Sequence, residues 1–298
     1  MISIVIASVN EKQLQDIKLN ISQTIGVAYE LIVFENSNGE RGLCAIYNQG
    51  ASEAKYELVC FMHEDIELKT KDWGKIVVDL FTENEKLGVV GVAGSAYKSL
   101  APSGWGSESF EKPTNFFNYI QYFKRSETKE IHAYYNPNNV KFEKVVAVDG
   151  MWMCSTKTVV SRNPFDDDLF KGFHCYDLDF CLNVGSNYDI IVSFEVLMAH
   201  FSEGGYDKTW FFETLKLHEK WKGQLPRCTI SLTYGEKQLI EKRAYKRIIS
   251  KLVELNFKRS EIINFLNQQK TKFGIDRALF LKLKFYLIKF IYFGKRVK

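Results

Sequence analysis

Residues 56–70, YELVCFMHEDIELKT, join an apolar run to a cluster of acids. The apolar part, 57–62, is typical of a buried strand. The polar side chains that follow it are His63, Glu64, Asp65 and Glu67. Crowded carboxylates are unfavourable unless a cation lies among them, and a hard divalent cation such as Mg²⁺ keeps positions open for substrate phosphates, while Mn²⁺ also accepts imidazole. The alternative is a solvated loop whose acids cap the next helix.

Two later segments also carry residues suited to chemistry. His200 ends the apolar run VLMAH, and is either a second metal ligand or a hydrogen-bonded structural residue. Asp177 and Asp179, in HCYDLDF, are two residues apart, so they cannot lie on one helix face. Their apolar neighbours can raise a carboxyl pKa toward that of a general base. The alternative is a pair of acids at a helix N-terminus.

Apolar runs and helical spacings alternate through the first 94 residues. The predicted strands are 2–8, 29–36, 56–62 and 87–94, and the predicted helices are 11–25, 42–54 and 72–85. This alternation predicts a three-layer α/β fold around a parallel sheet. In such sheets ligands bind beyond the carboxyl ends of the strands.

The three predicted carboxyl ends are all polar, and we expect them to converge. They are Ser8-Val9-Asn10, Glu35-Asn36-Ser37 and His63-Glu64-Asp65. No GxGxxG follows the first strand, which disfavours a dinucleotide site.

The second half of the chain is less regular. Residues 95–143 are predicted to be irregular, since 95–115 has the Gly, Ser and Pro content of a long functional loop. The elements predicted after it are a strand in 143–155, a short helix in 173–186 starting near His174, one or two strands in 188–205 ending at His200, an amphipathic helix in 207–223 and helices from 236 to the end.

Taken together, these segments resemble the glycosyltransferase family 2-like group of the GT-A fold, in particular a bacterial subgroup. The resemblance covers about 1–223 and rests on the order of SIVIASVN, VFENS, YNQGASEA, MHEDIEL, VVGVAG, VDGMWM, FHCYDLDF, AHFSEGG and HEKW. It implies a Rossmann-like α/β/α domain with a mixed, mostly parallel sheet, followed by a C-terminal helical extension. The domains expected are 1–230, nucleotide-sugar binding and catalysis, and 231–298, a basic helical extension.

The resemblance assigns roles residue by residue. The family's DxD element falls on His63-Glu64-Asp65, so Asp65 is the expected ligand of Mg²⁺ or Mn²⁺, together with His200. His63 stands where the family has an acid. The expected base is Asp177, preceded by Tyr176 where the family has Glu.

Further roles follow from the same resemblance. The expected donor-nucleotide positions are Ser8, Asn10, Glu35, Asn36, Asn48, His63 and Glu64. The residues expected on the acceptor side are Trp105, Asp149, Trp152 and Asp179. Trp105 and Trp152 can stack on sugar faces, although Trp152 fits a core position equally well.

The implied reaction is a transfer from a nucleoside-diphosphate sugar to a hydroxyl of a glycan or lipid-linked glycan. The metal would offset charge on the leaving diphosphate while Asp177 takes the acceptor proton. One displacement with one base inverts the anomeric centre, and the bacterial subgroup points to surface polysaccharide synthesis.

Charge is distributed unevenly along the chain, whose net charge is +4. From Glu236 onward there are 17 Lys/Arg against 5 Asp/Glu, whereas 1–235 has 23 against 31. The stretch 277–298 has seven Lys/Arg and no acid, interleaved with apolar residues. On a helix Lys282, Lys289 and Arg296 would share a stripe, which fits an anionic membrane surface. The alternative is a helix packed on the domain with solvated lysines; nucleic acid is disfavoured by the acidic body.

The remaining sequence signals favour a cytoplasmic protein, with the tail as a peripheral contact to the inner face of the cell membrane. Six scattered cysteines without a CxxC pair are expected to be reduced core thiols. The N-terminus lacks the features of a signal peptide, and no uncharged stretch approaches the length of a membrane helix.

Two other classes of function compete with the transferase. A sugar-nucleotide-forming nucleotidyltransferase would need a Gly- and Lys-rich loop after the first strand, where ASVNEKQLQD has no glycine. A non-catalytic GT-A-like module that binds a glycan or partner is favoured by His63 and Tyr176 in place of acids. Asp65, Asp177 and His200, which all remain, argue against such a module.

Overall fold

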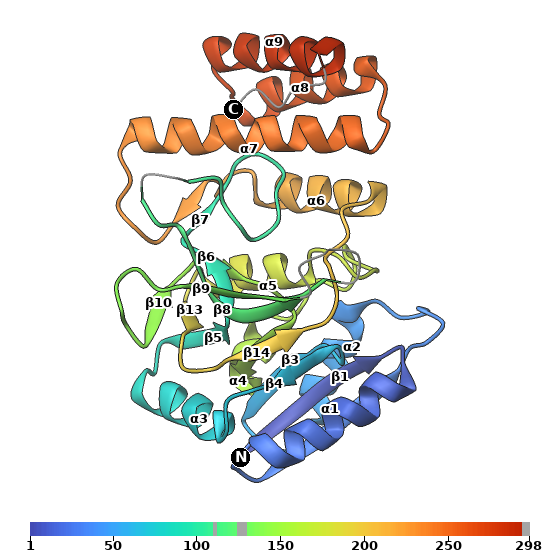
Figure 1. The fold of residues 1–298 in the computed structure, drawn as a ribbon, viewed down its shortest axis with the longest axis vertical. Helices are drawn as coiled ribbons and strands as arrows, with labels where there is room; N and C mark the ends of the chain where they lie inside the picture. The colour runs from blue at the N-terminus through green and yellow to red at the C-terminus, as the bar shows by residue number, and fades with distance from the viewer. Residues whose placement is uncertain (110–111, 124–129, 294–298) are drawn as a thin grey trace.

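The protein was analysed as a computed structural model that describes residues 1–109, 112–123 and 130–293. A three-layer α/β body lies below a stack of helices formed by the C-terminal part of the chain (Figure 1). The three-layer arrangement predicted from the sequence is confirmed.

The central sheet of the body is mixed and mostly parallel, as expected. Its order among the described residues is β10-β13-β5-β12-β3-β1-β2, and β10 and β12 run antiparallel to their neighbours. The strands are β1 (Ile2–Ser8), β2 (Tyr29–Glu35), β3 (Leu58–Met62), β5 (Leu87–Gly91), β10 (Phe142–Lys144), β12 (Trp152–Thr156) and β13 (Asp189–Ser193).

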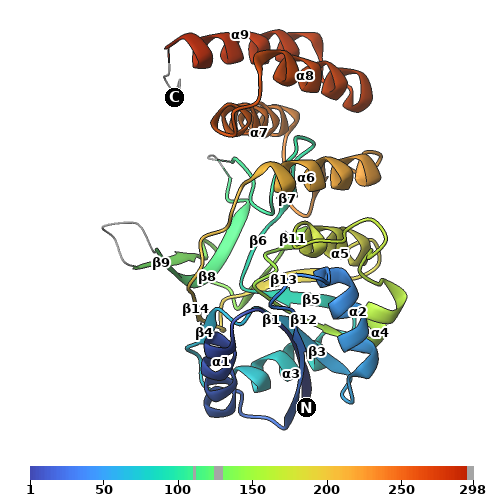
Figure 2. The ribbon, with the colours of Figure 1, turned by 90° about the vertical axis from the view of Figure 1, so that its right-hand side faces the viewer.

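Helices cover both faces of this sheet (Figure 2). They are α1 (Glu11–Thr24) and α3 (Trp73–Glu83) on one face, and α2 (Leu43–Glu53), α4 (Lys157–Arg162) and α5 (Tyr176–Val184) on the other. The alternation in β1 explains both layers, because Ile4 and Ile6 pack toward α1 while Val5 packs toward α2. A strand buried on both faces reads as a continuous apolar run, which is what the sequence shows.

The prediction that 95–143 is irregular was wrong, because part of it forms a second sheet. The order of this sheet is β11-β6-β8-β14-β4, with β9 paired to β8. Its strands are β4 (Ile66–Leu68), β6 (Ala93–Ser95), β8 (Asn115–Tyr122), β9 (Glu130–Tyr135), β11 (Ala147–Val148) and β14 (Met198–His200). The sequence of β8, NFFNYIQY, is only half-buried, so it lacks the apolar run that identifies the central strands.

The second sheet has a direct consequence for the site. β14 pairs antiparallel with β4, and His200 lies opposite Ile66, the residue after Asp65. The pairing therefore brings together two segments 135 residues apart in the chain. A two-stranded sheet of β7 (Tyr97–Lys98) and β15 (Arg227–Cys228) lies nearer the C-terminal helices.

Four long helices form the C-terminal part. They are α6 (Lys208–Trp221), α7 (Tyr234–Glu254), α8 (Arg259–Phe273) and α9 (Arg277–Phe293). Helices α7 to α9 build an apolar core of their own, to which α6 contributes Trp210 and Phe211. The helical prediction is confirmed as far as residue 293, whereas 294–298, with Arg296, lie outside the described residues. None of the helices in the described part of the chain is long and apolar enough to cross a membrane.

One buried carboxylate joins these helices to the body. Glu241 of α7 is 7% exposed and accepts hydrogen bonds from the Tyr97 and Ser99 hydroxyls, both at 2.8 Å. It also accepts bonds from the backbone N–H groups of Leu100 and Ala101, at 2.9 and 3.2 Å. A buried charge is tolerated only with such partners, so this contact fixes α7 against the loop that leads into residues 102–108.

Candidate functional site

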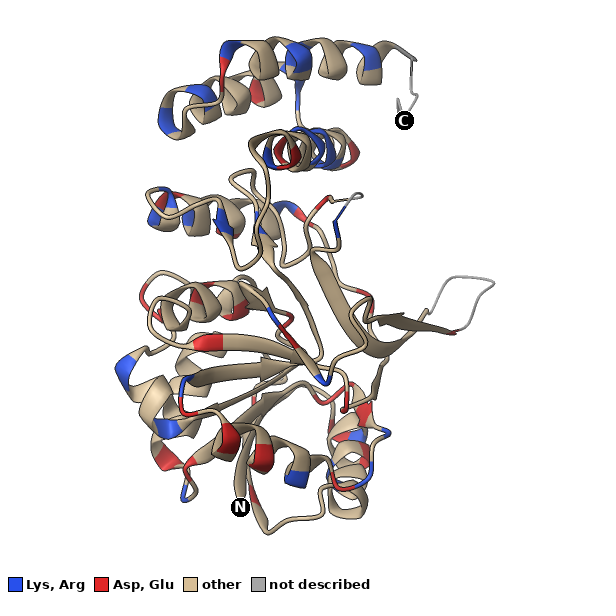
Figure 3. Cartoon of the chain, turned by 90° about the vertical axis from the view of Figure 1, so that its left-hand side faces the viewer, with Lys and Arg blue, Asp and Glu red and all other residues tan. Residues whose placement is uncertain are grey.

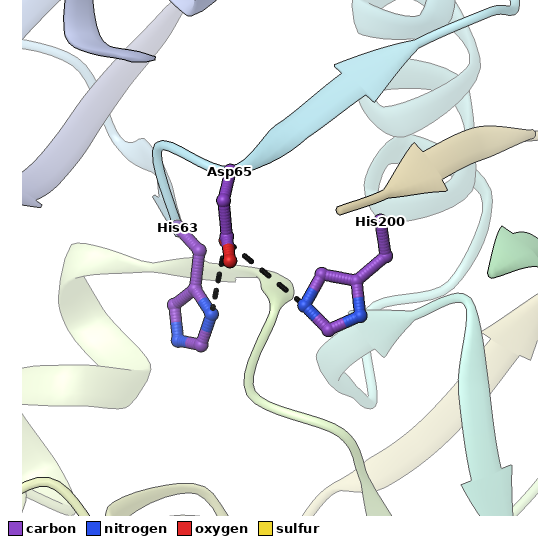
Figure 4. A group of neighbouring side chains, drawn as sticks. All are labelled: His63, Asp65 and His200. Atoms are coloured by element: carbon purple, nitrogen blue, oxygen red, sulfur yellow. Dashed lines mark ion pairs between the residues drawn. The ribbon is translucent and has the colours of Figure 1, made fainter. Parts of the chain in front are cut away.

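Three potential ligands of one metal ion meet at the carboxyl edge of the sheet (Figure 4). The Asp65 Oδ1 atom lies 3.8 Å from the His63 Nδ1 atom and 4.0 Å from the His200 Nε2 atom. All three side chains are less than one fifth exposed. All three ligand atoms lie within 4.8 Å of one another. Atoms that bind one ion at roughly 2.0–2.2 Å lie at most about 4.4 Å apart, so a small approach of the side chains would let them share a divalent cation.

Hydrogen bonds orient both imidazoles of this group. His63 Nε2 lies 2.7 Å from the Tyr176 hydroxyl, and His200 Nδ1 lies 3.3 Å from the Gln121 Oε1 atom. Burial lowers the pKa of His63, with Asp65 acting in the opposite direction, and a lowered pKa favours the neutral imidazole that a metal ligand requires. Gln121 belongs to β8, the strand that the sequence analysis missed.

Glu64 links the ends of two neighbouring strands. Its carboxylate accepts hydrogen bonds from the Ser8 hydroxyl at 2.6 Å and from the Val9 N–H at 2.9 Å. Glu64 and Ser8 are both buried. The buried Glu64 carboxylate therefore holds together the ends of β1 and β3, where we predicted the donor nucleotide.

Asp177, the predicted base, lies beside Asp149. Burial first, and then the neighbouring Asp149 carboxylate, raise the pKa of the Asp177 carboxyl to about 7, against backbone N–H groups that lower it. One of these is the Gly150 N–H, which donates to the Asp177 Oδ2 atom at 3.2 Å. A carboxyl with a pKa near neutrality can accept a proton at physiological pH.

Trp105 connects this pair to a cavity. Its indole N–H donates to the Asp149 Oδ2 atom at 2.6 Å. The same residue lines a cavity of about 240 Å³ between the 102–108 loop, the start of α6 and α7. Tyr206 and Trp210 add aromatic surface to it, and Arg247, paired with Glu108 at 2.6 Å, adds a polar wall.

Four predicted nucleotide positions hold hydrogen bonds within the protein, three of them to neighbouring residues and one to a distant segment. Asn10 caps α1 by accepting from the Gln13 N–H, and Asn36 closes a turn onto the backbone of Arg41. Glu35 is exposed, and its hydrogen bonds from Ser37 lower its pKa. Asn48 lies farther away, since its amide donates to the Phe165 carbonyl and accepts from the Phe165 N–H.

Two predicted acceptor-side residues lie in the interior instead. Trp152 is fully buried and packs edge-on against Trp73, so it offers no face to a sugar. Asp179 is 1% exposed and accepts from the Trp221 indole N–H at 2.7 Å and from Lys220 at 2.8 Å. These contacts attach α6 to α5, which is a structural role.

Sequence reasoning missed Tyr176 and Gln121 as site residues. Tyr176 is adjacent to the predicted base, and its departure from the family pattern was the signal that could have marked it. Gln121 offers no such signal, because its place beside His200 depends on the pairing of β8 with β14.

Comparisons with known proteins agree with this fold. The sequence profile of the family described as "Glycosyltransferase like family" matches residues 3–216. S. aureus TarS 1–349, solved in complex with UDP-GlcNAc, has 12% sequence identity and a TM-score of 0.50, with 100% of this chain and 93% of that chain covered. GalNAc-T7, solved with UDP, GalNAc and Mn²⁺, has 11% identity and a TM-score of 0.50, with 98% of this chain and 58% of that chain covered.

No curated protein matches the sequence. The chain therefore belongs to the glycosyltransferase-like family, and it is a glycosyltransferase of the GT-A fold.

Proposed function

We propose that this enzyme is an inverting, metal-dependent transferase that moves a sugar from a nucleoside-diphosphate sugar to a hydroxyl acceptor in bacterial surface polysaccharide synthesis. One observation carries the proposal. The Asp177 carboxyl, whose pKa is raised to about 7, directly follows Tyr176 in the chain, and the Tyr176 hydroxyl lies 2.7 Å from Nε2 of His63 in the group formed with Asp65 and His200.

The donor would bind at the ends of β1, β2 and β3. The two solved structures with a similar fold hold UDP or UDP-GlcNAc, which supports a nucleotide-sugar donor here. Asp65 and His200 would hold Mg²⁺ or Mn²⁺, which offsets the charge on the departing diphosphate. The hydrogen bond between Ser8 and Glu64 would hold the ends of β1 and β3 together beneath the nucleotide.

The acceptor would approach from the side of Asp149 and Asp177. Asp177 takes the proton from the attacking hydroxyl as the new bond forms at the anomeric carbon, which inverts the configuration. Asp149 raises the pKa of Asp177 and holds Trp105 in place. The apolar face of Trp105 and the cavity beside it suit a sugar ring of a glycan acceptor.

We further propose that residues 231–298 form a separate helical extension that contacts an anionic membrane surface at the inner face of the cell membrane. Leu281, Phe285, Ile288 and Tyr292 follow helical spacing on α9 and are 37–67% exposed. Lys282 and Lys289 flank this stripe, and the helix carries no acid. An apolar stripe with flanking lysines is typical of helices that lie in the membrane interface, where a lipid-linked acceptor would be found.

Family membership favours the enzyme over the non-catalytic module considered from the sequence. The decisive experiment is a thermal-shift series with UDP, GDP, dTDP and CDP, each with Mn²⁺ and with EDTA. Binding to the folded state raises the melting temperature. We expect one nucleotide to produce a shift that EDTA abolishes and that Asp65→Ala removes.

The matched control is Glu67→Ala, two residues away, whose exposed carboxylate pairs with Lys69. This variant should keep the shift. A wild-type protein that responds to none of the four nucleotides at millimolar concentration would contradict the proposed donor site.

A further inference from the structure

The two positions at which the chain departs from the family pattern are in contact. His63 stands at an acidic position of the DxD element, and Tyr176 stands at the Glu of the base motif. They are 113 residues apart in sequence, yet the His63 Nε2 atom lies 2.7 Å from the Tyr176 hydroxyl oxygen. Their roles therefore have to be considered together.

Each imidazole of the group has one ring nitrogen turned toward Asp65 and the other held by a neighbour. Tyr176 holds Nε2 of His63 and leaves Nδ1 facing the Asp65 Oδ1 atom. Gln121 holds Nδ1 of His200 and leaves Nε2 facing the same oxygen, with the rotatable Ser202 hydroxyl 3.2 Å away. An acceptor on the remote ring nitrogen is the arrangement that orients metal-ligating histidines.

The backbone is shaped to let Tyr176 reach His63. A Cβ atom at Gly150 would lie 2.1 Å from the Tyr176 hydroxyl oxygen, so only glycine fits there. A tyrosine hydroxyl can accept a hydrogen bond as well as donate one. When it accepts from His63 Nε2–H, the lone pair of Nδ1 points toward Asp65.

From this geometry we propose that His63 is a third protein ligand of the metal and that Tyr176 is the positioning residue that selects its ligating tautomer. The inference rests on the proposed function and specifies the ion. Two imidazoles and one carboxylate favour a transition metal such as Mn²⁺ over Mg²⁺, which prefers oxygen ligands alone.

The test measures Mn²⁺ itself, without turnover. Free Mn²⁺ is followed by its aqueous electron paramagnetic resonance signal during titration of the full chain in the presence of UDP. Tyr176→Phe removes one hydroxyl and should weaken Mn²⁺ binding about 10–100-fold. Spin-echo spectra of bound Mn²⁺ should show nitrogen couplings from two imidazoles in the wild type and from one in His63→Ala. His63→Asp should let Mg²⁺ compete more effectively.

Tyr47→Phe is the matched control. Tyr47 packs edge-on against Tyr176, and its buried hydroxyl has no hydrogen-bond partner among the described residues. This variant should bind Mn²⁺ like the wild type. If Asp65→Ala abolishes binding while Tyr176→Phe and His63→Ala leave both affinity and nitrogen couplings unchanged, the inference is overturned and the proposed function stands. A wild-type chain that binds no Mn²⁺ with UDP contradicts both.

Discussion

Lys and Arg are concentrated in the C-terminal helices, whereas Asp and Glu are spread over the body (Figure 3), and the two regions use these charged residues in opposite ways. In the body, the carboxylates of Glu64, Asp65 and Asp177 lie at least partly buried, beside the Ser8 hydroxyl, the His63 imidazole and the Gly150 N–H respectively. Along α9, lysines such as Lys282 and Lys289 flank apolar side chains that face the solvent. Buried charge creates pKa shifts and ion sites, whereas exposed charge governs which surfaces the protein meets. This difference is consistent with our proposals that catalysis takes place in the body and that the helical extension contacts a membrane surface.

Near the junction between the two regions, the charged groups are buried and hydrogen-bonded, as they are in the body. Lys98 is 1% exposed, and its ammonium donates to the Ser103 carbonyl and hydroxyl at 2.7 and 2.8 Å. It also lies 3.2 Å from the His218 Nε2 atom, and burial lowers the pKa of Lys98 to about 8. Together with Glu241, this residue fixes the loop that carries Trp105. The extension therefore reaches the site through buried contacts.

The sharpest test of the division is Asp177→Asn. An amide keeps the shape of the side chain but cannot take the acceptor proton, so turnover should fall about 10²–10⁴-fold. The nucleotide-dependent thermal shift should remain, because the donor site that we propose lies on the side of the metal group. Asp168→Asn, an exposed acid of the same body, should leave turnover unchanged. Undiminished turnover in Asp177→Asn would remove Asp177 from its proposed role.

Glu241→Ala tests whether the two regions depend on each other. The variant removes the acceptor of four hydrogen bonds in a buried place, and of their donors only the Ala101 N–H keeps another acceptor among the described residues, the Ser99 hydroxyl, so the free energy of unfolding should fall by about 2–4 kcal/mol. Denaturant unfolding measures this loss. Glu254→Ala, on the exposed face of the same helix, should cost less than about 1 kcal/mol. Equal effects of the two substitutions would show that the junction is not held by Glu241.

The pH dependence of turnover should follow the raised pKa of Asp177. In the proposed mechanism its ionised form is the base, so the rate should fall about tenfold for each pH unit below about 7. Stability should change in the opposite sense. The folded state holds this proton more tightly than the unfolded chain, so the contribution of Asp177 to stability is greatest below pH 4 and is lost as the pH rises toward 7. A rate profile that stays flat from pH 5 to pH 8 would contradict this assignment.

The smallest effect is expected for the exposed face of α9. Leu281→Ser combined with Phe285→Ser should weaken binding to phosphatidylglycerol-containing vesicles by about tenfold, since each side chain loses its burial in the interface. Vesicle sedimentation measures the change, and turnover on a water-soluble acceptor should stay as it was. Leu19→Ser, an equally exposed leucine of the body, is the control. If the wild-type protein does not bind anionic vesicles, the proposed membrane contact of the extension is contradicted.

The parts of the fold that the sequence predicted are those in which local pattern and burial agree. The run 2–8 becomes a strand buried on both faces, and the polar residues after it and after 58–62 converge as parallel strands require. The strand at 115–122 was not predicted, because half-buried strands mix aromatic and polar residues and because the residues before it have the composition of a loop.

Side-chain partners were harder to predict than strands. Asn48, Trp152 and Asp179 have residue types suited to binding, but their partners lie in distant elements and claim them for structural contacts. The contact between His63 and Tyr176 spans 113 residues and depends on the space at Gly150. A single sequence shows which residue types are present, but it does not show which distant residues come into contact.

The position of Trp105 also gives the protein an intrinsic fluorescence signal for the region beside Asp149. Of the five tryptophans, all in described parts of the chain, Trp73, Trp152, Trp210 and Trp221 are buried, and Trp105 is the partly exposed one. Its indole is bonded to Asp149 and borders the cavity beside the proposed base. The long-wavelength part of the protein's fluorescence should therefore come mainly from this side chain. Arrival of an acceptor glycan would change that emission, so candidate acceptors can be screened optically, without labels and without a donor sugar.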